Sequence, residues 1–93
     1  MNKLLTGDEL IDYAKEIKSK EEFEYFLQCL AKDCTDNQSE WENTNLIDYL
    51  TGLSKYVVDM EGYYRSIGEN IDVEKVTWRI VAEMLIAASV YGN

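Results

Sequence analysis

The stretch DMEGYYR, at residues 59–65, gathers the side chains of this chain that are best equipped for chemistry: two carboxylates, two tyrosine hydroxyls and one guanidinium. A pair of facing carboxylates is the equipment of acid–base catalysis, as in glycoside hydrolysis. On a helix, however, Asp59 and Glu61 point about 200° away from each other, so they cannot act on one substrate atom. We therefore interpret these two acids as part of a solvated helical surface.

The remaining chemical side chains form no recognisable site. The chain contains no histidine, and it has no glycine-rich phosphate loop and no pairing of a nucleophile with a base. Cys29 and Cys34 are too far apart along a helix for a disulfide bond, and two cysteines without histidine do not complete a zinc site. We predict a protein that is not an enzyme, with no cofactor, no metal and two reduced cysteines.

The charge of the chain narrows the choice of partner. Eighteen acidic residues against nine basic ones give a net charge of −9, which repels phosphate backbones and anionic membrane surfaces and attracts basic proteins. The longest nearly apolar run, residues 80–91, contains Glu83 and is shorter than the ~20 residues that span a bilayer. We expect a cytoplasmic protein that binds another, basic protein and neither nucleic acid nor membrane.

The spacing of apolar residues predicts an all-α fold, a compact four-helix domain that spans residues 1–93. There is no proline and no strand-like alternation, and the apolar residues recur at helical intervals. Thr6 with Glu9, and Ser19 with Glu22, have the spacing of capping boxes that begin the first two helices. The four helices are expected near residues 7–18, 20–33, 45–67 and 73–91.

The third helix is expected to be the longest, with Gly68 as its stop. Its apolar residues alternate spacings of four and three, which predicts a seam facing the core: Leu46, Leu50, Leu53, Val57, Met60 and Tyr64. Tyr49, Tyr56 and Tyr63 run beside the seam. These tyrosines either flank the packed seam or form an exposed line that, with Asp48, Asp59 and Glu61, binds a protein.

The last helix is apolar around almost its whole circumference, which predicts a central position in the bundle. Its one polar strip, Lys75, Arg79 and Glu83, continues into an apolar surface at Ile86 and Val90. That surface is either covered by another helix or open to a partner. Burial of Ile86 and Val90 in a homodimer is therefore the alternative interface.

The WEN motif at residues 41–43 is interpreted as structural. Asn43 or Thr44 can cap the third helix, and Trp41 can bury its indole under the preceding loop. Trp78 is interpreted in the same way, as an anchor in the core, with Arg79 pairing with Glu83 one turn later.

Three blocks in this order, WEN, DMEGYY and WRxxAExLxAAxxY, resemble a family of small, uncharacterised bacterial domains over residues 20–91. The chain departs from that pattern because it has no proline before Trp78 and has Gly92 where an acidic residue is usual. The resemblance implies an all-helical fold and leaves the function open. A looser similarity in size, acidity and tyrosine content links the chain to the immunity proteins of nuclease bacteriocins.

We therefore expect a non-enzymatic, acidic protein-binding module, in its sharpest form an immunity-like or antitoxin-like neutraliser of a basic protein. The expected contact surface is Tyr49, Tyr56, Asp59, Glu61 and Tyr63. The alternative is a structural subunit or homodimer that assembles through the C-terminal helix.

Overall fold

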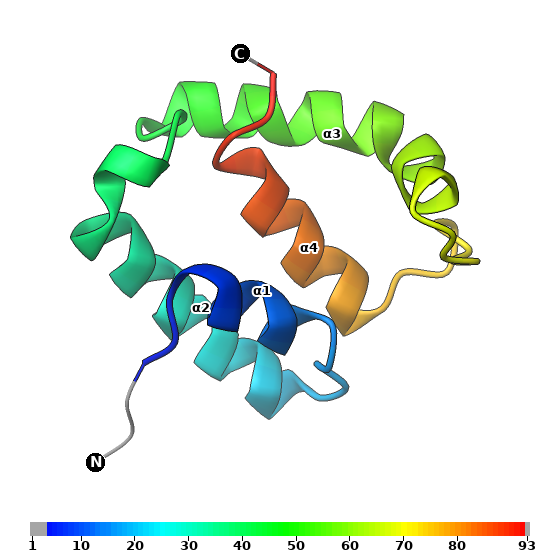
Figure 1. Ribbon diagram of the computed structural model, residues 1–93, viewed down its shortest axis with the longest axis horizontal. Helices are drawn as coiled ribbons and strands as arrows, with labels where there is room; N and C mark the ends of the chain where they lie inside the picture. The colour runs from blue at the N-terminus through cyan, green and yellow to red at the C-terminus, as the bar shows by residue number, and fades with distance from the viewer. Residues whose placement is uncertain (1–3, 93) are drawn as a thin grey trace.

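The computed structural model describes residues 4–92, and within that range the chain forms helices and no strand (Figure 1). The elements are α1 (Gly7–Ala14), α2 (Lys20–Asp36), the short 3-10 helix η1 (Gln38–Glu40), α3 (Leu46–Ser66) and α4 (Trp78–Ala88). The predicted all-α fold with a long third helix is confirmed.

Side-chain caps begin most of these helices. The Ser19 hydroxyl accepts a hydrogen bond from the backbone amide of Glu22 at 3.1 Å, and the Glu22 carboxylate accepts one from the backbone amide of Lys18 at 2.8 Å. The capping box expected at Thr6 is wrong, because the Thr6 side chain makes no cap. The amide of Gly7 donates instead to the Asp33 carboxylate at 3.2 Å, so α2 helps to cap α1.

The third helix begins at a different cap from the two expected. The side chain of Asn45, rather than Asn43 or Thr44, accepts the backbone amide of Asp48 at 2.8 Å. Gly68 ends the helix as predicted, with a φ of +78°, a left-handed conformation that suits glycine.

The last helix is shorter than the range expected from the sequence. It begins after Thr77, whose hydroxyl accepts a hydrogen bond from the backbone amide of Ile80 at 3.1 Å. Residues 67–77 form a non-helical connection across one end of the domain.

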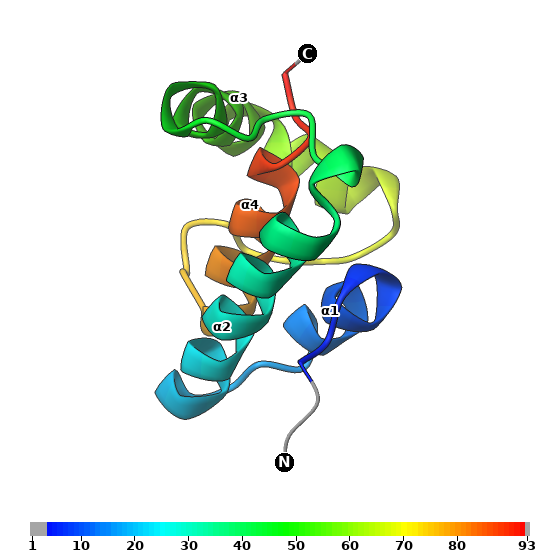
Figure 2. The same cartoon turned by 90° about the vertical axis from the view of Figure 1, so that its left-hand side faces the viewer.

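The prediction that the C-terminal helix is central is confirmed, since α4 packs against each of the other three α-helices. Figure 2 shows α4 between α3 on one side and the pair α1 and α2 on the other. Each side has its own buried cluster. The first is Leu10, Ala14, Ile17, Phe26, Cys29, Leu30 and Ala82, and the second is Tyr56, Met60, Tyr64 and Ile80.

The seam predicted to face the core from α3 is largely outside, which is the main correction to the sequence analysis. Leu46 is 70% exposed, and Leu50 and Val57 are 52% and 44% exposed. Only its last two members, Met60 and Tyr64, are buried. The buried surface of α3 is therefore rotated toward Gly52 and Tyr56.

Gly52 explains this rotation. A Cβ atom at Gly52 would lie 2.7 Å from the Tyr91 carbonyl oxygen and 2.9 Å from the Ala88 carbonyl oxygen. The C-terminal end of α4 can therefore approach α3 only at a residue without a side chain. Once α4 meets α3 at Gly52, the residue one turn further on, Tyr56, faces the core and the seam lies to the side.

Candidate protein-binding surfaces

Two of the three tyrosines expected at an exposed contact surface serve instead to hold α4 in place. The Tyr49 hydroxyl donates to the Leu85 carbonyl oxygen at 2.7 Å, and burial raises the pKa of Tyr49 to about 12. Tyr56 is 4% exposed, and its ring packs nearly perpendicular to the Tyr91 ring, with the centroids 5.5 Å apart. Burial also raises the pKa of Tyr56. Tyr63 is the one member of this line at the surface, with 49% exposure.

The acids of the expected surface are at the surface but do not converge. Asp59 accepts a hydrogen bond from the Tyr91 hydroxyl, and Glu61 forms an ion pair with Arg65 at 3.7 Å. Glu61 therefore pairs within α3, and Asp59 pairs with a residue beyond the end of α4. The two acids and Tyr63 do not form one open surface with the half-buried Tyr49 and the buried Tyr56. An exposed tyrosine line was one of the two arrangements expected from the sequence, because the aliphatic seam was predicted to occupy the core-facing side of α3.

A second polar cluster joins α3, α4 and the connection between them. The Tyr64 hydroxyl donates to the Glu83 carboxylate at 2.6 Å, and burial together with this bond raises the pKa of Tyr64. Arg79 bridges Glu83 at 3.1 Å and Glu69 at 2.7 Å, which confirms the expected pairing with Glu83. The hydrogen bond from Arg79 lowers the pKa of Glu69. Because each charged group is matched by a neighbour, we interpret the cluster as a structural tie.

The WEN motif is structural, as expected, but through different contacts. Asn43 is 1% exposed, and its side-chain amide donates to the carbonyl oxygens of Ala88 and Tyr91, both at 2.9 Å. The Trp41 indole nitrogen donates to the Asp33 carboxylate at 2.9 Å. The motif therefore fastens the end of α4 to α3 and the loop before α3 to α2.

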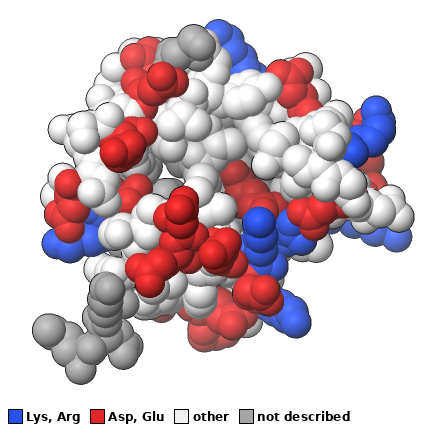
Figure 3. Space-filling model, in the orientation of Figure 1, with Lys and Arg blue, Asp and Glu red and all other residues white. Residues whose placement is uncertain are grey.

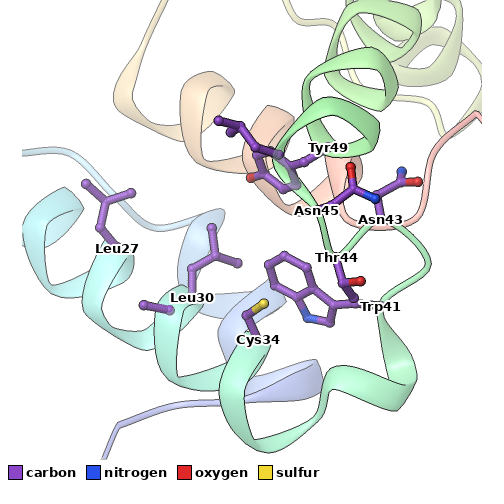
Figure 4. Close-up of a pocket in the computed structure, with 10 residues that line it drawn as sticks. Leu27, Leu30, Cys34, Trp41, Asn43, Thr44, Asn45 and Tyr49 are labelled. Carbon is purple, nitrogen blue, oxygen red and sulfur yellow. The ribbon is translucent and has the colours of Figure 1, made fainter.

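A groove separates α2 from the beginning of α3 (Figure 4). Its volume is about 390 Å³, and its lining is uncharged and mostly apolar, with Leu27, Leu30 and Cys34 on the side of α2. The rings of Trp41 and Tyr49 also line it and stack with their centroids 5.9 Å apart. The groove can accept an apolar group, but it offers no charged side chain for catalysis.

A separate hollow of about 210 Å³ lies between α1 and the C-terminal end of α4. Ile11 of α1 and Val90 line it and are 42% and 47% exposed, while Ile86 contributes to its floor and packs against the first core cluster. The sequence analysis named Ile86 and Val90 as an alternative interface but did not connect them with Ile11. Exposed apolar side chains around a concave surface are typical of a protein contact.

Acidic residues border this hollow. Asp33 and Glu40 belong to its lining, and Asp8 and Asp12 are exposed on α1 next to Ile11. Figure 3 views this side of the molecule and shows acidic groups around an uncharged central area. The hollow therefore combines an apolar lining with acidic side chains around its rim.

No described residues form a group of three or more histidine, cysteine, aspartate or glutamate side chains that could hold a metal ion. Within residues 4–92, no helix combines the length and the apolar character needed to cross a membrane.

Residues 19–92 match a family of unknown function, DUF7660. The chain belongs to this family. The match covers α2, α3 and α4 and includes the WEN, DMEGYY and WR blocks, so the groups that fasten α4 to α3 lie within the family region. No curated protein and no solved structure matches the chain.

Proposed function

We propose that this protein is a non-enzymatic binding module that docks a basic protein on the acidic hollow between α1 and the end of α4. The observation that carries the proposal is the pairing of half-exposed apolar side chains, Ile11 and Val90, with an acidic border. An apolar side chain of the partner would be desolvated in the hollow, and basic residues around it would meet the rim.

The distribution of charge supports a basic partner at this place. The net charge is −9, and α1 carries three acidic residues, Asp8, Glu9 and Asp12, with no basic residue. By contrast, α3 carries three acidic and two basic residues. A basic protein is therefore steered toward the side of the molecule that carries α1, most strongly at low salt.

In its finer form, the proposal is that the partner is a basic enzyme and that binding neutralises it, in the manner of an immunity protein or antitoxin. The small acidic all-helical chain supports this form by analogy. A cytoplasmic location belongs to the same proposal and is supported by two cysteines that are free in the structure.

The alternative of a homodimer through the C-terminal helix has less support. Ile86 contacts the core, and Val90 lies in a concave surface, whereas a twofold contact between identical surfaces requires self-complementary shapes. A second copy would also bring two acidic rims together.

The test is capture of partners from the native cell with three tagged variants. Ile11→Lys and Val90→Lys place a charge in the hollow, and Leu50→Lys places the same charge on a residue of similar exposure outside it. We expect the wild type and Leu50→Lys to retain one basic protein that both hollow variants lose. Retention of the same proteins by all four forms would refute the hollow as the docking site.

A further inference from the structure

The proposed function leaves the exposed apolar surface of α3 unused. None of the residues lining the acidic hollow belongs to α3. Besides the exposed seam residues, α3 shows Ile47 at 77% and Val58 at 82% exposure. Among the described α-helices, α3 packs against α4 alone, so its outer side has no cover from α1 or α2. Figure 2 shows α3 at one edge of the domain, away from both.

We infer that this surface of α3 binds a second copy of the chain, with the two α3 helices antiparallel around a twofold axis. The contact would use the seam, in which Leu46, Leu50 and Val57 are exposed and Leu53 is half-buried, with Ile47 and Val58 at its margin. This inference rests on the spacing, charge and exposure of the α3 residues, and it does not depend on the acidic hollow.

The spacing along the seam suits a second copy of the chain. From Leu46 to Val57 the intervals are four, three and four residues, so the pattern is the same when it is read in either direction. An antiparallel copy therefore meets it in register, with Leu46 opposite Val57 and Leu50 opposite Leu53. In a twofold interface each such contact occurs twice. Intervals of four and three are also those that let two helices interlock at a shallow crossing angle.

The charge of this surface permits self-association although the chain as a whole carries −9. Between Leu46 and Val58 the only charged residues are Asp48 and Lys55. At about 100° per residue, both point almost directly away from the seam. Within this stretch the contact therefore brings no like charges together, and salt screens the acidic residues outside it, Glu61 included, at distances beyond about 8 Å at physiological ionic strength.

The size of the contact predicts a weak dimer. The apolar stretch is about 18 Å long at 1.5 Å per residue. One helix surface of this length buries less than the roughly 800 Å² that each partner buries in a standard interface. Dimerisation should therefore depend on concentration.

The experiment is sedimentation equilibrium of the whole chain from about 10 µM to about 1 mM, the range appropriate to a small interface. We expect the average mass to rise from 10.8 kDa toward twice that value. Leu46→Glu with Val57→Glu should keep the mass at the monomer value, because like charges then face each other. Leu46→Lys with Val57→Glu should restore the dimer, because the antiparallel register places each lysine opposite a glutamate.

The positions of these substitutions keep the test decisive. Leu46 and Val57 are 70% and 44% exposed, so neither change enters the core, and circular dichroism checks that both variants are folded. Val90→Glu is the matched control in the hollow and should leave the dimer intact. A wild-type chain that stays monomeric throughout, a dimer that only Val90→Glu disrupts, or equal behaviour of the two double variants would overturn the inference.

Discussion

Replacing Gly52 with alanine should destabilise the protein even though alanine is the better helix former. In an exposed helix, this change stabilises by roughly 0.5–1 kcal/mol, because glycine loses more backbone freedom on folding. At Gly52, the added Cβ would lie 2.7 Å from both the Asn43 side-chain nitrogen and the Tyr91 carbonyl oxygen. Real Cβ atoms do not sit this close to other heavy atoms, so α3 and the end of α4 must move apart.

The expected magnitude combines two costs with one opposing gain. Overpacking of a tight contact costs about 1–3 kcal/mol, and disturbance of the buried Asn43 hydrogen bonds adds about 1–3 kcal/mol. After the gain in helix propensity, we expect Gly52→Ala to lower the free energy of unfolding by about 2 kcal/mol. For a domain of this size, that change lowers Tm by roughly 8–16 °C.

Gly62 provides the control within the same helix. It is exposed, its φ is not positive, and a Cβ there would meet nothing within 4 Å. Urea unfolding followed by circular dichroism should show Gly62→Ala stabilised by about 0.5–1 kcal/mol and Gly52→Ala destabilised. If Gly52→Ala were as stable as Gly62→Ala, the close approach of α4 to α3 would be refuted.

Three further predictions concern single side chains. Asn43→Ala should lower the free energy of unfolding by about 2–3 kcal/mol, because it removes two buried hydrogen bonds, whereas loss of the exposed Asn45 cap should cost about 1 kcal/mol; urea unfolding compares the two. Burial opposes ionisation of Asp33, but hydrogen bonds from Trp41, Asn37 and Gly7 outweigh burial and lower the pKa of this carboxylate. The stabilising effect of ionised Asp33 is therefore present above its unfolded pKa and is lost as the pH falls through its folded pKa. Asp33→Asn should therefore lose less stability than the wild type between pH 7 and acidic pH, and equal losses would contradict this assignment. Burial raises the pKa of Tyr49 to about 12, so its stabilising effect is present below the unfolded value of 10.0 and is lost as the pH rises toward 12; Tyr49→Phe should remove one late step from the ultraviolet titration of the tyrosines.

The sequence predicted the helices well because their signals are local. Ser19 and Glu22 mark the start of α2, and Gly68 marks the end of α3, by contacts within a few residues. The nearly complete apolar circumference of α4 likewise predicted its central position, because a helix that is apolar on almost every side must be covered by others.

The orientation of α3 was missed because it depends on a contact distant in sequence. Periodicity favoured the aliphatic seam, but α3 meets α4 at Gly52, which a hydrophobic pattern does not record. A glycine in the middle of a long helix is costly unless something approaches closely, and Gly52, Tyr56 and Met60 recur every four residues. That signal could have placed Tyr56 inside.

The candidate surfaces could be predicted only in part from the sequence, because they too depend on contacts between residues distant in the chain. Val90 was named from its place on the last helix, but its association with Ile11 requires α1 to lie beside the end of α4. The exposed seam of α3 emerged only when the structure showed no helix covering it.

The most direct test of the proposed function is calorimetric titration of the captured basic partner into the wild type, Val90→Lys and Leu50→Lys at two salt concentrations. We predict that Val90→Lys weakens binding at least about tenfold, or about 1.4 kcal/mol, that Leu50→Lys leaves it unchanged, and that higher salt weakens the wild-type complex. An unchanged Kd for Val90→Lys, or an affinity that salt does not alter, would contradict docking of a basic protein on the acidic hollow.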